Sequence, residues 1–168
     1  MNQLKKYTII GIIFVLITGT LSHFIYDWSG KNFIVGFFCP VNESTWEHMK
    51  LVFFPMLVYS LFMYRKLSKY YPCIFASLSL GILIGTFLIP VIFYTYTGIL
   101  GYNLFILDIT TFALSSIFAF YSIYKITKSY KRKYCISLLC IVVFVVMLCF
   151  MAFTYHPPQI GLFAVPVT

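Results

Sequence analysis

The sequence has few charged residues, and very few acidic ones. Only 10% of its 168 residues are Asp, Glu, Lys or Arg, and only four are acidic. A soluble domain carries about 25% charged residues, and an intrinsically disordered chain has low hydrophobicity. This chain is 61% hydrophobic. Because roughly a third of the surface of a chain of this size stays exposed on folding, a water-soluble fold could not hide so much apolar surface. The sequence therefore predicts a membrane protein.

Signals for disulfide scaffolds and for nucleic-acid binding are also lacking. The five cysteines are odd in number and form neither a CxxC pair nor a secreted-scaffold spacing. We interpret them as small hydrophobic residues. The net charge of +8 resides in short clusters between apolar runs and not on one face of a soluble domain, so we expect no nucleic-acid partner.

Long apolar runs make up most of the chain. A helix needs about 20 apolar residues to span a membrane. The runs that meet this length are 7–28, 44–64, 73–97, 103–124 and 134–155. The first run follows Lys5 and Lys6, but it is too long for the apolar region of a signal peptide, and no small-residue cleavage site follows it. We expect an all-α integral membrane bundle of about five transmembrane helices, forming a single domain over residues 1–168.

The basic residues predict the orientation, because Lys and Arg accumulate in cytoplasmic loops. One side of the expected spans holds Lys5, Lys6, Arg65, Lys66, Lys69, Lys125, Lys128, Lys131, Arg132 and Lys133, and the other side holds Lys31 and Lys50. This bias predicts a cytoplasmic N-terminus and an external C-terminus. The basic clusters are expected to contact anionic membrane lipids.

The acidic residues and histidines gather at the opposite, outer end of the expected spans. They are His23, Asp27, Glu43, Glu47, His48, Asp108 and His156. Because they come from four separate segments, we expect them to form a polar site. Asp108 is the most informative of them, since an ionisable residue inside a span is a functional-site hypothesis by default.

Their spacing leaves structural alternatives open. His23 and Asp27 lie four residues apart on one helical face, so Asp27 alone could satisfy the histidine. The residues from Ser44 to Glu47 fit a capping box, in which Ser44 caps a helix and the Glu47 side chain reaches back to the N–H of Ser44.

Three further features concern packing rather than chemistry. The segment 31–40 is too apolar for an aqueous loop, so it should lie in the interface or dip into the membrane. Two stripes of residues are expected to face neighbouring helices. They are Asp108, Thr111 and Ser115, and the small residues Ser77, Gly81 and Gly85.

Histidines beside carboxylates suit a divalent metal such as zinc. The candidate metal ligands are His23, His48, His156, Asp108 and Asp27. The candidate catalytic residues are Glu47, Glu43 and Ser44, with either glutamate as the general base on a metal-bound water. A site in the outer leaflet favours a lipid or a membrane-anchored substrate. The alternative is a non-enzymatic protein that binds a solute or ion, transports it, or serves as a subunit of a homo-oligomer or a larger membrane assembly.

Two resemblances bear on these interpretations. The block PVNESTWEHMK at 40–50, with His23 followed by 27–30 (DWSG) and a late pair of prolines at 157–158, resembles a family of small multi-pass membrane proteins of unknown function from Gram-positive bacteria. This resemblance covers essentially the whole chain and implies a bacterial cytoplasmic-membrane location. Ser44 and His48 also have the S-x-x-x-H spacing of membrane-embedded zinc hydrolases related to alkaline ceramidase, with Asp108 in the place of their intramembrane Asp and without their H-x-x-x-H pair.

Overall fold

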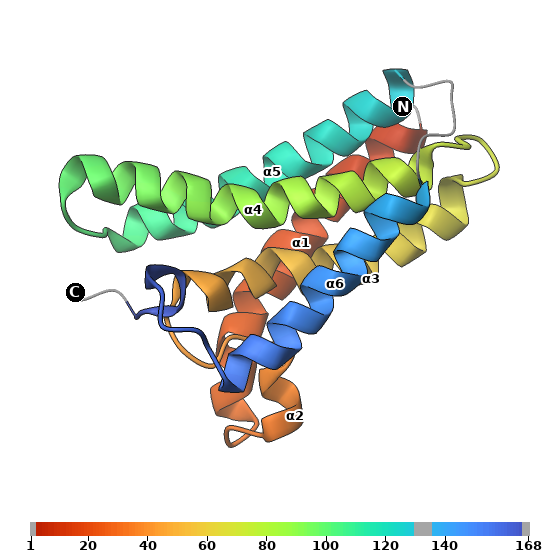
Figure 1. Ribbon diagram of the computed structural model, residues 1–168. Helices are drawn as coiled ribbons and strands as arrows, with labels where there is room; N and C mark the ends of the chain where they lie inside the picture. The colour runs from red at the N-terminus through yellow and green to blue at the C-terminus, as the bar shows by residue number, and fades with distance from the viewer. Residues whose placement is uncertain (1–2, 130–135, 166–168) are drawn as a thin grey trace.

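The computed structural model describes residues 3–129 and 136–165. These residues form helices and contain no strand, which confirms the all-α class (Figure 1). The elements are α1 (Gln3–Trp28), α2 (Phe33–Gly36), α3 (Thr45–Leu67), α4 (Ile74–Leu100), α5 (Phe105–Ser129), α6 (Ile136–Tyr155) and the short 3-10 helix η1 (Gly161–Phe163).

Four of these helices are long and apolar enough to cross a membrane, which indicates a membrane protein. They are α1, α4, α5 and the part of α6 from Leu138 to Tyr155. The remaining long helix, α3, occupies the expected span 44–64 and has 23 residues. It is not among the four because its ends are charged: Glu47 and Lys50 lie near its start, and Arg65 and Lys66 lie in its last turn.

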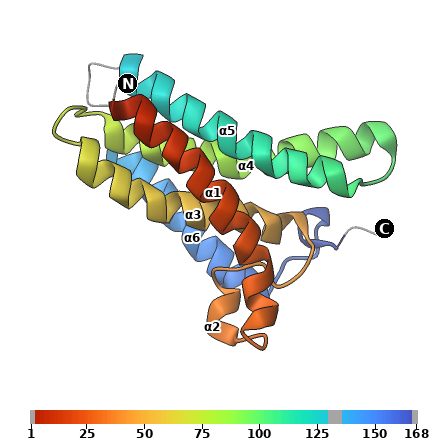
Figure 2. The ribbon, with the colours of Figure 1, turned by 180° about the vertical axis from the view of Figure 1, so that it is seen from behind.

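Helix α3 is the centre of the bundle. Figure 1 shows α6 in front of it, and Figure 2, seen from behind, shows α1 on its opposite face. Its buried residues include Met49, Val52, Phe53, Met56 and Met63. Because burial of apolar area is the main favourable term in packing, α3 is the helix around which the others assemble.

The two ends of the bundle differ in chemistry. The start of α1, the end of α3, the start of α4 and the end of α5 meet at one end (Figure 1). The basic residues on these segments are Lys5, Lys6, Arg65, Lys66, Lys69, Lys125 and Lys128, while Lys131, Arg132 and Lys133 lie outside the described residues. Helix α2 lies at the other end, as the tip of the molecule beyond the last turn of α1.

The apolar segment 31–40 contains this short helix, whose start is capped by the Asn32 side chain.

Small residues bring α4 and α5 together, as the stripe of Ser77, Gly81 and Gly85 predicts. A Cβ atom placed on Gly85 would lie 2.8 Å from the Cβ of Ala119 and 3.1 Å from Val52 Cγ1. The Cβ of Ala119 is fixed to the backbone of α5, so it cannot move aside alone. The glycine therefore sets the distance between α4 and its neighbours.

We predict that Gly85→Leu destabilises the bundle by about 1–3 kcal/mol, because overpacking forces the helices apart. The matched control is Gly98→Leu on the same helix, where an added Cβ meets nothing within 4 Å. Leucine is the better helix former by up to about 1 kcal/mol, so the control should be neutral or slightly stabilising. Thermal unfolding in detergent measures both, and equal melting temperatures for the two variants would contradict this packing role.

Candidate metal centre

Two histidines and a glutamate from three separate segments meet near the end of the bundle that carries α2. His23 comes from the last part of α1, Glu43 from the loop between α2 and α3, and His48 from the first turn of α3. The His48 Nε2 atom lies 3.2 Å from Glu43 Oε2, and the His23 Nε2 atom lies 3.5 Å from the same oxygen. Atoms of all three side chains that can bind a metal lie within 4.8 Å of one another.

These separations suit a shared metal ion. Zinc binds His nitrogen and carboxylate oxygen at about 2.0–2.2 Å, so neighbouring ligands of a tetrahedral ion lie about 3.3–3.6 Å apart. The distances of 3.2 and 3.5 Å from Glu43 to the two histidines are close to this spacing. Two of the three separations in the cluster are therefore close to those between ligands of one tetrahedral ion.

Glu43 is the most accessible of the three. Its side chain is 61% exposed. The hydrogen bond with His48 holds the pKa of the Glu43 carboxyl below its usual value; partial burial opposes this, while the charges of His48 and His23 support it. A carboxylate that stays ionised is a better metal ligand, because metals bind the deprotonated form. More than half of the Glu43 side chain is thus open to solvent beside the cluster.

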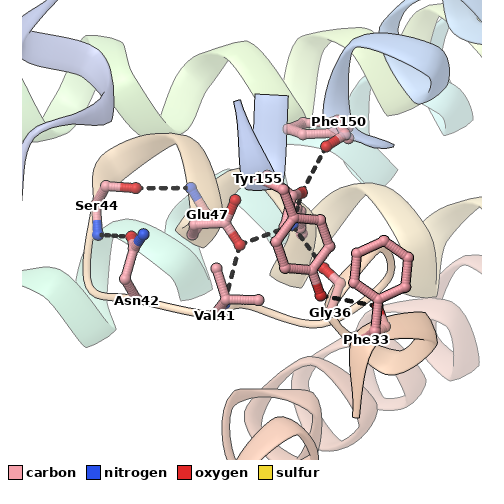
Figure 3. A network of polar contacts seen from close by, with 10 residues as sticks. Phe33, Gly36, Val41, Asn42, Ser44, Glu47, Phe150 and Tyr155 are labelled. Carbon is pink, nitrogen blue, oxygen red and sulfur yellow. Dashed lines mark hydrogen bonds and ion pairs between the residues drawn. The ribbon is translucent and has the colours of Figure 1, made fainter. Parts of the chain in front are cut away.

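A buried ion pair lies on the neighbouring face of α3. Glu47 is 2% exposed and Lys50 is fully buried, and their Oε2 and Nζ atoms lie 2.7 Å apart. The Lys50 ammonium also donates to the carbonyl oxygen of Gly36 at 3.0 Å and to Thr154 Oγ1 at 2.6 Å. An ammonium group has three N–H donors, so every donor of Lys50 has a partner. The Glu47 carboxylate also accepts the backbone N–H of Val41 at 3.0 Å (Figure 3).

The sequence analysis did not identify this pair. Lys50 was predicted only as a basic residue of the outer side, whereas in the structure its side chain has no solvent exposure. The spacing of three residues between Glu47 and Lys50 was the available signal, since such pairs share a helical face. The partner Thr154 lies 104 residues away and left no local signal.

The capping box forms only in part. Ser44 caps α3 as expected, with its Oγ accepting the N–H of Glu47 at 3.4 Å. The Glu47 side chain does not reach back to Ser44 but turns to Lys50 and Val41. The N–H of Ser44 donates instead to Asn42 Oδ1 at 2.9 Å.

The other expected site residues lie elsewhere. Asp27 is exposed in the last turn of α1, and His156 is exposed just after α6. Asp108 accepts a hydrogen bond from the Tyr96 hydroxyl, which links α5 to α4. The other two residues of its stripe, Thr111 and Ser115, are buried in the bundle as expected. Of the candidate metal ligands, the structure thus brings together His23 and His48, and it adds Glu43 to them.

We predict that Lys50→Met destabilises the protein by about 3–5 kcal/mol, because it leaves the Glu47 charge buried without a partner. The control is Lys31→Met, which removes an exposed lysine from the same end of the bundle and should change stability by no more than about 0.5 kcal/mol. Denaturant unfolding in detergent compares the two variants. A Lys50→Met protein as stable as the control would show that the pair is not charged and buried as described.

Comparison with known proteins identifies the family but not an activity. No curated protein and no solved structure matches the chain. The likeness to ceramidase-related hydrolases is a likeness of residue spacing. In the structure, Ser44 caps the start of α3 and Asp108 accepts a hydrogen bond from the Tyr96 hydroxyl. A family match covers residues 1–168, and the chain accordingly belongs to the family described as "Family of unknown function (DUF6512)".

Proposed function

We propose that this protein is a metal-dependent membrane hydrolase whose ion is bound by His23, Glu43 and His48. The observation that carries the proposal is the convergence of two imidazole nitrogens and one carboxylate oxygen at distances of 3.2 and 3.5 Å. Two His and one Glu form a ligand set of known catalytic zinc sites. Structural zinc sites use four protein ligands, whereas catalytic ones keep a position for water or substrate.

A zinc ion held by these residues would supply hydrolytic chemistry. A bound zinc ion lowers the pKa of its water to about 7 and polarises a carbonyl or phosphoryl oxygen. Glu47 is not free to serve as the general base, because its carboxylate is engaged by Lys50 and by the N–H of Val41. Glu43 would hold the ion, and its carboxylate, which is exposed to solvent, could also accept a proton from water. The proposed role of Glu43 is therefore ligand first and proton acceptor second.

The surroundings of the cluster favour a lipid substrate. The ring of His23 lies 5.3 Å from that of Phe24, and Phe24 stacks on Trp28. Trp28 ends α1, and Phe33 and Ile34 belong to α2 at the tip of the molecule; all three are well exposed. Exposed aromatic residues at a membrane protein's end belong to the interface between lipid and water. A cluster on the inner side of such residues is within reach of the linkage between the headgroup and the acyl chains.

Elemental mass spectrometry of the detergent-purified protein tests the metal centre. We expect about one zinc or similar ion per chain in the wild type, and loss of that ion in His48→Ala, because the substitution removes one of three ligands. His156→Ala is the matched control, since its side chain lies outside the cluster, and it should retain the ion.

The same three proteins, incubated with vesicles of phosphatidylglycerol and cardiolipin, test hydrolysis. Mass spectrometry should detect lysolipid or released headgroup with the wild type and His156→Ala but not with His48→Ala. A bound ion without product would retain the metal centre and favour the non-enzymatic alternative of ion binding or transport. Absence of the ion from all three proteins would overturn the proposal.

We also propose that the chain crosses a bacterial cytoplasmic membrane five times. Helix α3 would be the fifth span beside the four most apolar helices, and the N-terminus would lie in the cytoplasm. The basic end of the bundle supports this orientation, because positive residues are retained on the cytoplasmic side. In a cysteine-free background, a membrane-impermeant thiol reagent should label Lys31→Cys in intact cells. Lys69→Cys should be labelled only after the cells are opened. The reverse pattern would contradict the orientation and place the metal centre inside.

A further inference from the structure

Glu43 differs from the two histidines in how the chain positions it. His23 and His48 lie on the regular helices α1 and α3, whose backbone hydrogen bonds fix their directions. Glu43 lies in the loop from residue 37 to residue 44, between α2 and α3. Fixing a loop residue in one conformation costs backbone entropy, which other contacts must offset. Something other than secondary structure must therefore hold this carboxylate beside the histidines.

The loop and its approach are held at three points (Figure 3). The carbonyl oxygen of Gly36 accepts a hydrogen bond from Lys50, and the N–H of Val41 donates to Glu47. The Asn42 side chain closes a turn by accepting the N–H of Ser44. Two of these three anchors come from the buried ion pair, and the third is the Asn42 turn. Val41 and Asn42 lie two residues and one residue before Glu43. The carboxylate of Glu43 projects from the segment that these contacts fix.

We propose that Glu47 and Lys50, together with Asn42, are positioning residues that hold Glu43 in place as a metal ligand. The inference rests on the proposed metal centre and assigns a role to residues whose side chains do not bind the ion. Partners that orient metal ligands typically contribute about 10–100-fold to metal affinity. Without these anchors, His23 and His48 would remain on their helices, but the third ligand would have to be ordered each time the metal binds.

Titration of the full-length, metal-free protein with Co²⁺ tests this inference through both affinity and visible absorption. The variant is Glu47→Leu combined with Lys50→Met, because replacing a whole buried ion pair by apolar residues of similar volume is often neutral for stability. We expect a folded protein that binds Co²⁺ about 10–100-fold more weakly than the wild type. Its absorption bands should shift, because Glu43 no longer completes the coordination.

A second variant and a control separate positioning from stability. Asn42→Ala changes an exposed residue, so it should fold, and it should also weaken Co²⁺ binding by loosening the turn before Ser44. The control for stability is Gly81→Leu, whose side chain would crowd Ile123 of α5 and touches neither the loop nor the ion pair. The Gly81→Leu protein should melt at a lower temperature and bind Co²⁺ with unchanged affinity and spectrum.

The outcomes are distinguishable. A wild type that binds no Co²⁺ would overturn the proposed metal centre, and this inference with it. A wild type that binds Co²⁺, beside folded double-variant and Asn42→Ala proteins with the same affinity and spectrum, would overturn the positioning role and leave the metal centre intact. An equal loss of affinity in Gly81→Leu would also overturn it, because it would trace the effect to stability alone.

Discussion

A lysine ammonium group enclosed by protein connects three parts of the chain. The Nζ atom of Lys50 joins its own helix α3, through Glu47, to the carbonyl of Gly36 in α2 and to Thr154 near the end of α6. Removing such a charge from water costs several kcal/mol, which only well-placed partners can offset. The path of the chain around Lys50 is thus constrained: α2, the start of α3 and the end of α6 must all meet at this one point.

The candidate metal centre depends on that constraint. Helix α3 carries both the ion pair and His48, so the contacts that fix α3 in the bundle also place one ligand. The loop that leaves α2 must return to α3 past Glu47, and Glu43 lies on this return. Tyr155 strengthens the same junction, because its hydroxyl donates to the carbonyl of Phe33 at 2.8 Å and its ring stacks on the ring of Phe33. Helix α2 is thereby held both by Tyr155 and by the hydrogen bond of Gly36 with Lys50.

Much of the fold follows from composition, whereas the site follows from geometry that composition does not contain. Apolar runs of about 20 residues predict helices, and each expected span contains one. The sequence also placed the histidines and acids at one end, but their meeting depends on helix rotation and loop path. Asp27 is one turn from His23 and yet exposed, while Asp108 is taken by Tyr96. The burial of Lys50 could not be predicted, because lysine is almost never fully buried.

X-ray absorption spectroscopy of the zinc-loaded, purified protein tests the central claim most directly, because it reports the atoms that bind the ion. We predict a first shell of nitrogen and oxygen at about 2.0–2.2 Å, with the scattering pattern of two imidazole rings and no sulfur. The Glu43→Ala protein should keep the two imidazole rings and lose one oxygen ligand. A sulfur ligand, or a first shell that Glu43→Ala and His48→Ala leave unchanged, would contradict the assignment of the ion to His23, Glu43 and His48.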